Sequence, residues 1–231
     1  MKYLGIIFLS GLLIGCQTTN DWTSLFDGNS FDGWHVYGAG QDFDGWYVDQ
    51  GVLVLDPARR TKARNSNLIT NEKYKDFELS IDWMISENGN SGIFWGVLED
   101  TGRFEHPYQT GPEIQILDDN YQEYIDQRGD INRAGSLYNL LPPSKIVAKT
   151  ANEWNHMILH IDQTNNSGFV KLNGELILEF PVNGPEWKAL ISASGFSGWD
   201  GFGQMEEGHI CLQDHGSQVA FRDIRIRKLN Q

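Results

Sequence analysis

Cysteine is scarce in this chain of 231 residues, which contains only Cys16 and Cys211. A small secreted fold held together by several disulfides is therefore excluded. If Cys16 carries a lipid, as argued below, Cys211 has no intramolecular partner. We expect the stability of the fold to come from a buried apolar core, which a chain of this length can form.

Positive charge is also in short supply. Lysine and arginine together number 18 against 31 acidic residues, for a formal net charge of −13. This balance argues against nucleic acid and against an anionic membrane surface as partners. It allows a neutral ligand such as a sugar, and the content of 40% hydrophobic and 21% charged residues is that of an ordinary globular protein.

Long apolar runs are missing except at the N-terminus, where residues 3–14 follow the single charge of Lys2. The run is too short for a comfortable transmembrane helix, which needs about 20 residues. It ends in Leu13-Ile14-Gly15-Cys16, the pattern of a signal sequence whose cysteine becomes lipidated. The alternative is an ordinary cleaved signal peptide with a chance cysteine.

These features predict three parts of the chain. Residues 1–15 are a signal peptide, residues 16–21 are a lipidated N-terminus and tether, and residues 22–231 form one domain. Gln17 follows the lipidated cysteine, and because no aspartate there signals retention in a bacterial inner membrane, we expect an outer-membrane anchor. The chain then touches a membrane only through its N-terminal lipid, in the periplasm or at the cell surface.

Helical periodicity is nearly absent, whereas strand patterns recur. Residues 77–85 alternate apolar and polar side chains, as a half-buried strand does. Residues 46–56 predict a hairpin that turns at 49–51, and residues 168–180 predict another that turns at Asn173-Gly174. Many antiparallel strands in one unit predict an all-β fold of two packed sheets, a jelly-roll β-sandwich.

Several familiar catalytic and metal motifs are missing. No glycine-rich loop has the strand–turn–helix context of a nucleotide site, and no G-x-S-x-G nucleophile elbow occurs. The acid-rich residues 118–130 lack the ligand spacing of a calcium loop. His156 and His160 lie about 13 Å apart if they share a strand, too far to chelate one ion.

Three polar segments remain as candidates for chemistry. In residues 111–119, GPEIQILDD, strand alternation places Glu113 and Gln115 on one face and isoleucines on the other. The other two candidates are residues 131–143, with Arg133, a Gly-Ser strand and Tyr138, and residues 208–221, with Gln213, Asp214 and His215 before Gly216. Each has a structural alternative: a solvated sheet face, a core tyrosine or a hairpin turn.

Seven segments of the chain together resemble one known family. They are WTSLFDGNSFDGWHV, ENGNSGIFWGV, GPEIQILDD, RAGSLYNLLPP, NEWNHMILHID, VKLNGELI and GHICLQDHGSQVAFRDIRIRKL, in this order. In this combination the chain resembles the 3-keto-disaccharide hydrolase domain family of bacterial secreted proteins, over about residues 22–229. The resemblance implies a concanavalin A-like jelly-roll sandwich. It also implies action on glycosides already oxidised to a ketone at C3.

The same fold carries laminarinase-like glucanases, whose strand motif is E-x-D-x-x-E or E-x-D-x-E. Here Glu113 is followed by Gln115 in place of the aspartate and by Leu117 in place of a second glutamate. Retaining hydrolysis needs two carboxyl groups about 5 to 5.5 Å apart. The departure argues against an ordinary endoglucanase.

A C3 ketone makes another route available, in which a base removes the C2 hydrogen, the enolate expels the C1 substituent and water adds back. Such a route needs one base, one acid and donors near the ketone oxygen. His215 requires the smallest pKa change to act as base, and Glu113 can serve as acid or base if burial raises its pKa.

Other residues are assigned to substrate binding. We assign Gln115, Arg133, Tyr138 and Asp214 to this role, with Trp95 or Trp199 stacking on a sugar ring unless they lie in the core. A divalent cation held by carboxylates is an alternative to these donors, although no ligand spacing demonstrates one.

Two non-enzymatic alternatives stay open at this point. A lectin-like carbohydrate-binding module would also have a polar, aromatic groove, but it would not bring an acid and a base together. A purely structural surface lipoprotein would leave the polar segments unexplained.

Overall fold

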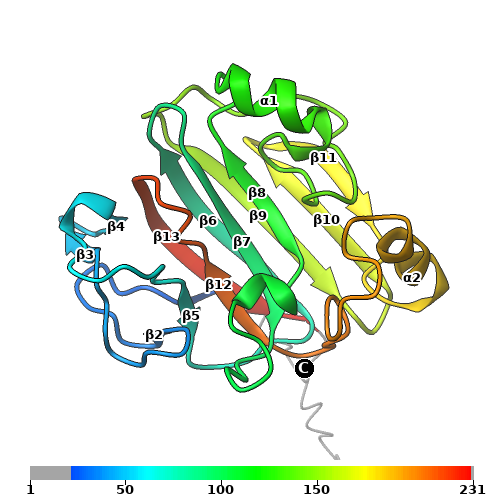
Figure 1. Cartoon of the computed structure of the whole chain (residues 1–231), viewed down its shortest axis with the longest axis horizontal. Helices are drawn as coiled ribbons and strands as arrows, with labels where there is room; N and C mark the ends of the chain where they lie inside the picture. The colour runs from blue at the N-terminus through cyan, green and yellow to red at the C-terminus, as the bar shows by residue number, and fades with distance from the viewer. Residues whose placement is uncertain (1–21, 230–231) are drawn as a thin grey trace, which may run out of the picture.

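The computed structural model describes residues 22–229, and most of its regular structure is β (Figure 1). One antiparallel sheet has eight strands and the other has five. The larger runs in the order β11 (Glu175–Phe180), β10 (Ser167–Leu172), β9 (Asn155–Asp162), β6 (Phe77–Ile85), β13 (Val219–Lys228), β4 (Val52–Leu55) and β3 (Trp46–Asp49), with β1 (Thr23–Ser24) beside β13. The smaller runs β2 (Trp34–Val36), β5 (Leu68–Thr70), β12 (His209–Leu212), β7 (Asn90–Val97) and β8 (Glu113–Leu117).

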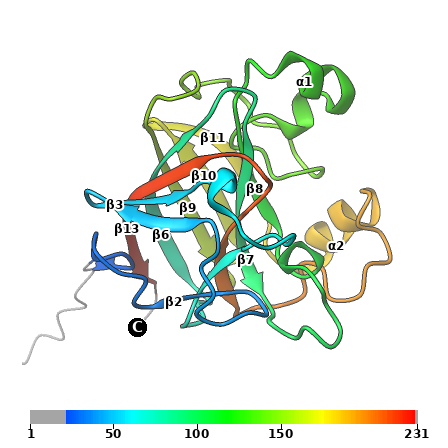
Figure 2. The same ribbon diagram turned by 60° about the vertical axis from the view of Figure 1, so that its left-hand side comes forward.

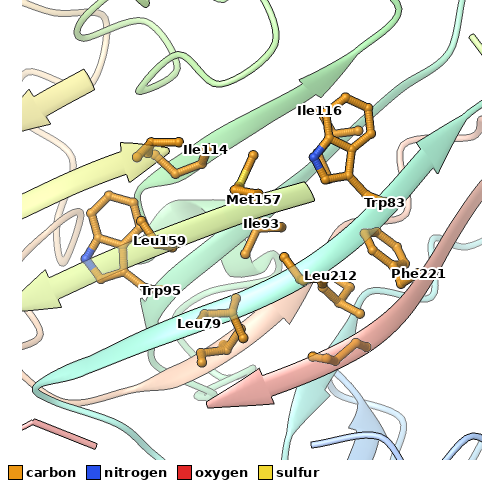
Figure 3. Packing of buried hydrophobic residues seen from close by; sticks show 14 of the residues in the cluster. Leu79, Trp83, Ile93, Trp95, Ile114, Ile116, Met157, Leu159, Leu212 and Phe221 are labelled. Carbon is orange, nitrogen blue, oxygen red and sulfur yellow. The ribbon is translucent and has the colours of Figure 1, made fainter. Parts of the chain in front are cut away.

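The two sheets pack face to face, and the predicted jelly-roll sandwich is confirmed. Apolar side chains from both inner faces fill the space between the sheets. Figure 3 shows Ile93, Ile114 and Ile116 of the smaller sheet among Leu79, Trp83, Met157, Leu159 and Phe221 of the larger one. The alternation of residues 77–85 is therefore that of a strand with one face in this core.

Both predicted hairpins are present. Strands β3 and β4 pair through the turn at Gln50-Gly51, and β10 and β11 pair through Asn173-Gly174. Asn173 and Gly174 both have positive φ, 52° and 87°, as a tight two-residue turn requires. His156 and His160, on β9, instead bind carboxylates of neighbouring β6, at 2.7 Å to Asp82 and 3.1 Å to Glu78.

The helical segments differ from the sequence-based expectation. The structure contains helices α1 (Gln122–Arg128) and α2 (Gly184–Ser192), which the sequence pattern did not indicate, and short 3-10 turns η1 (Pro57–Arg59), η2 (Pro107–Gln109) and η3 (Asp130–Asn132). Figure 2 shows α1 and α2 on the side of β7 and β8, away from β6 and β13. The helices are seven and nine residues long, too short for a clear periodic signal.

The Gly-Ser segment is not a regular strand. It runs antiparallel to β8, and backbone hydrogen bonds join Tyr138 N–H to the Glu113 oxygen and Gln115 N–H to the Ser136 oxygen. Its pairing with that strand is limited to a single bridge, Leu137 opposite Ile114. Gly135 has φ +81°, which breaks the extended conformation. Likewise, the Asp-His-Gly turn is no hairpin, because β12 and β13 belong to different sheets and the turn crosses between them.

No helix within residues 22–229 is both long enough and apolar enough to cross a membrane. The predicted signal peptide and the predicted lipidation site, Cys16, lie outside the described residues.

Candidate active site

A cavity of about 460 Å³ opens on the face of the smaller sheet that points away from the core. Side chains of β7 and β8 and of the turn after β12 form its floor, and four loops form its walls. Its lining residues are Asn65, Asn67, Asn90, Phe94, His106, Tyr108, Gly111, Glu113, Gln115, Tyr138, Asn139, Gly195, Phe196, Trp199, Phe202, Gln213, Asp214 and His215. The volume lies within the range of about 300 to 1,000 Å³ of small-molecule sites.

Glu113 lies on the cavity floor and is only 8% exposed. Its side chain crosses Gly92 of the neighbouring strand β7, where a Cβ atom would stand 2.1 Å from the carboxyl Oε1. Burial raises the pKa of the Glu113 carboxyl to about 8. At neutral pH this group therefore holds a proton that it can donate.

Two amide side chains flank Glu113 on the floor. Gln115 donates from Nε2 to Asn90 Oδ1 and to the Tyr124 hydroxyl, both at 3.2 Å. The side-chain oxygens of Gln115 and Gln213 are buried and accept no hydrogen bond from the protein. Both glutamines line the cavity, so their side chains border any ligand bound there.

His215 joins the same cavity from the turn that follows β12. The residue as a whole is exposed, but its ring is partly desolvated, which lowers the pKa of the imidazole, and the charge of nearby Arg128 lowers it further. His215 is therefore neutral at neutral pH and can accept a proton. The sequence placed Glu113 and His215 about a hundred residues apart, and the fold brings both to one cavity.

Asp214 differs from its neighbours because its carboxylate is already engaged. It forms an ion pair with Arg60 and accepts hydrogen bonds from the backbone N–H groups of Ser66 (2.7 Å) and Gly216 (3.1 Å). The side chain is fully buried. Asp214 thus holds the turn that carries His215, and Glu113 is the other carboxyl group among the described lining residues.

The sequence matches the family model of the 3-keto-alpha-glucoside-1,2-lyase-like domain over residues 21–227. The chain belongs to this family. A 3-keto-disaccharide hydrolase of Bacteroides thetaiotaomicron is 32% identical over 229 residues, covering 90% of this chain and 78% of the relative. The predicted family and the predicted hydrolase class are thereby confirmed.

Solved structures agree with this assignment. A Parabacteroides distasonis protein, provisionally named a glycosyl hydrolase, superposes on the lyase-like domain with a TM-score of 0.82 and 30% identity, covering 91% of this chain and 95% of its own. The carbohydrate-binding module CBM66 of Bacillus subtilis reaches a TM-score of 0.51 at 12% identity, over 85% of this chain and 96% of the module. The latter likeness shows the shared fold alone.

Two residues assigned to substrate binding are not on the cavity of the lyase-like domain. Trp95 is 3% exposed and lies in the core (Figure 3). Its ring centroid is 5.6 Å from that of Phe180. Its neighbour Phe94 faces the cavity instead, because alternate residues of β7 point to opposite faces. The sequence alone did not indicate which of the two faces Trp95 would take.

Arg133 also lies away from the cavity lining. Its Nε donates to Asp130 at 2.6 Å, and Nη1 reaches the backbone oxygen of Asp119 at 3.5 Å. Its role is to hold the loop of residues 129–139.

Tyr138 does line the cavity, as predicted for a substrate-binding residue. It lies beside Tyr124, whose pKa is raised by burial and further by Tyr138 and Glu113.

Most of the aromatic wall of the cavity was not predicted from sequence patterns. Two loops, residues 104–111 and 195–203, contribute His106, Tyr108, Phe196, Trp199 and Phe202. The rings contact one another, with centroids 4.9 Å apart for His106 and Tyr108 and 3.9 Å apart for Phe196 and Phe202. The signal in the sequence was the density of aromatic residues beside glycines in both loops.

Metal and thiol chemistry find little support in the described residues. No group of three or more His, Cys, Asp or Glu side chains between residues 22 and 229 could hold a metal ion. Cys211 is fully buried in the cluster that contains Phe94 of the cavity floor, and burial, with Glu113 nearby, raises the pKa of its thiol well above the usual value. A buried neutral thiol of this kind is unreactive.

Proposed function

We propose that this chain cleaves 3-keto-glycosides, including 3-keto-disaccharides, by removing the C2 proton, eliminating the C1 substituent and adding water. The chain is a carbohydrate-acting enzyme by family, and its Bacteroides relative carries the name 3-keto-disaccharide hydrolase. The observation that carries the mechanistic proposal is the pairing, in one cavity, of a protonated carboxyl group with a neutral imidazole.

The two groups have complementary roles. His215 takes the proton from C2, which the C3 ketone acidifies, and the resulting enolate forms a C1–C2 double bond as the C1–oxygen bond breaks. Glu113 gives its proton to the leaving oxygen. Water then adds a hydroxyl to C1 and a proton to C2, which completes a net hydrolysis without oxidation or reduction. His215 releases its proton to solvent and Glu113 takes one up from solvent, which restores both groups.

The remaining polar groups of the cavity bind and orient the sugar. The Gln115 and Gln213 side chains on the cavity floor form hydrogen bonds with hydroxyl groups of the sugar, and the Tyr138 hydroxyl donates to the ketone oxygen, where negative charge develops. Conventional double displacement is disfavoured, because Asp214, the second lining carboxyl group, is bound to Arg60.

We also propose that the domain works in the bacterial envelope, anchored to the outer membrane by a lipid on Cys16. The support is the sequence Leu13-Ile14-Gly15-Cys16 after an apolar run. A lipid tether would leave the cavity free to meet soluble substrates.

The proposed activity is tested by incubating purified protein with 3-keto-trehalose, with a 3-keto-β-glucoside and with both unoxidised parent sugars. We expect 3-keto-glucose to be released from one or both oxidised substrates and nothing to be released from the parents. Binding of the parent sugars without turnover of any ketosugar would instead indicate a lectin-like module.

The elimination step is tested with a substrate deuterated at C2. We expect a slower reaction and transfer of the label to water, because the C2–hydrogen bond breaks. Full retention of deuterium in the product would contradict elimination. Glu113→Gln and His215→Ala should each lower kcat by about 10² to 10⁴-fold, and wild-type rates in both would remove these residues from the mechanism.

A further inference from the structure

A second, shallower cavity of about 350 Å³ lies beside the candidate active site. Its lining residues are Arg103, Phe104, Tyr108, Gln109, Trp199 and Asp200. Tyr108 and Trp199 also line the first cavity, so their two rings form a wall common to both. A ligand that extends out of the first cavity across this wall enters the second.

These two rings are unusually exposed for their kind. Four large hydrophobic residues are exposed among the described residues, and Tyr108 (40%) and Trp199 (39%) are two of them. The other two, Ile146 and Leu176, line neither cavity. An exposed aromatic surface that borders two cavities is suited to contact the apolar face of a ring-shaped ligand.

The aromatic wall is held in place before any ligand binds. Trp199 contacts Phe196 at 5.2 Å and Tyr108 at 6.1 Å between ring centroids, and His106 stacks on Tyr108 at 4.9 Å. Gly201, with φ +90°, brings the Trp199 loop so close to Phe104 that a Cβ atom there would stand 2.8 Å from its ring. A rigid wall lowers the entropic cost of binding.

Polar groups surround this wall on the side of the second cavity. Arg103 Nη2 forms an ion pair with Asp200 Oδ2 at 2.9 Å, and both side chains are more than half exposed. Arg103 and Asp200 therefore offer a charged donor and a charged acceptor at the rim of the aromatic wall. This combination matches a pyranose, which has an apolar face of C–H groups and a rim of hydroxyl groups.

We propose that the second cavity is the subsite for the leaving sugar, which stacks on Tyr108 and Trp199 while the 3-keto sugar occupies the first cavity. The inference rests on the proposed function and adds a preference to it: the enzyme favours substrates whose leaving group is a sugar ring over substrates with a small alkyl leaving group.

The test compares two substrates, 3-keto-trehalose and methyl 3-keto-α-glucoside, which differ in the leaving group. The measured quantity is the ratio of kcat/KM for the disaccharide to kcat/KM for the methyl glycoside. Trp199→Ala and Tyr108→Ala should each lower this ratio about five- to tenfold, whereas Trp199→Phe, which keeps an aromatic ring, should restore most of it.

Two control variants lie away from both cavities. Trp154→Ala removes a tryptophan that lies under Arg222 at 4.0 Å, and Leu176→Ala removes a comparably exposed apolar side chain. Both should keep the wild-type ratio. An unchanged ratio in Trp199→Ala and Tyr108→Ala would overturn the subsite, including the case in which kcat/KM falls equally for both substrates.

Failure of the proposed function gives a different result, in which the wild-type protein cleaves neither substrate. Calorimetric titration with glucose, the leaving sugar, then decides the subsite by itself. Binding to the wild type that is weaker in Trp199→Ala supports it, and equal binding or none overturns it.

Discussion

At the scale of the residue, the chemistry depends on where one carboxyl group is placed. Glu113 lies opposite Phe94 in the strand register, but its side chain leans across Gly92, which has no side chain to oppose it. Because Gly92 has no Cβ atom, the Glu113 carboxyl can pack directly against the backbone of β7 in a buried position. Burial without a charged partner keeps the carboxyl protonated.

The space at Gly92 is tested by Gly92→Ala. The added methyl group would collide with the Glu113 carboxyl, so the side chain must turn away. We expect kcat/KM on a 3-keto-glycoside to fall at least about tenfold, since a displaced acid no longer reaches the leaving oxygen.

Gly102→Ala is the matched control, because a Cβ atom there meets its nearest neighbour at an ordinary 3.5 Å. It should retain full activity. Wild-type activity in Gly92→Ala would mean that the observed position of Glu113 is not required.

The raised pKa of Glu113 also predicts how stability depends on pH. The pKa rises from 4.5 to about 8 on folding, so between these values the folded chain holds a proton that the unfolded chain releases. The free energy of unfolding therefore falls as pH rises through this window.

Glu113→Gln removes this titration, so its stability relative to wild type should increase from pH 5 to pH 8, by on the order of 4 kcal/mol. Urea denaturation at several pH values measures the difference. A stability difference that is constant with pH would show that the Glu113 pKa is not raised.

At the scale of the element, the position of His215 depends on a crossover turn. Residues 213–216 leave β12 in the smaller sheet and lead to β13 in the larger one, and no hairpin pairing holds them. The turn is instead fixed by Asp214, which binds Arg60 and the backbone of Ser66. An ion pair to a distant loop thus places the proposed base.

Arg60→Met is expected to cost about 3 to 5 kcal/mol of stability, because it leaves the fully buried Asp214 carboxylate without its cation. Its neighbour Arg59 is the control: its side chain is 58% exposed and lies 3.6 Å from Asp56. Arg59→Met should cost about 1 kcal/mol or less. Equal losses in urea denaturation would contradict a structural role for the Arg60–Asp214 pair.

At the scale of the whole molecule, the sandwich separates stability from function. The core between the sheets holds the fold, while the opposite face of the smaller sheet, under the aromatic loops, carries the cavity. Loops can therefore vary around the cavity without disturbing the core.

The proposed lipid anchor also belongs to this scale. Full-length protein expressed in a Gram-negative host should be recovered with the outer membrane, and Cys16→Ser should move it to the soluble fraction. Cys211→Ala, which changes the other cysteine, should stay with the membrane. Soluble wild-type protein would contradict lipidation.

Much of this architecture could be predicted from local patterns. The alternation of residues 77–85 and the turn at Asn173-Gly174 depend on neighbouring residues only, and both predictions are confirmed. The alternation in residues 113–117 also predicted correctly that Glu113 and Gln115 share the face opposite Ile114 and Ile116.

The sandwich, its hairpins and the polar face of β8 follow from local sequence patterns, because strand periodicity and turn chemistry involve only neighbouring residues. The positions of Trp95 in the core, of Arg133 and Asp214 in loop contacts, and of His215 on the same cavity as Glu113 depend on the tertiary structure. The pairing of strands and the packing of distant loops decided these roles. A residue's own neighbours in the sequence do not specify which distant groups bury it, neutralise it or leave it free to react.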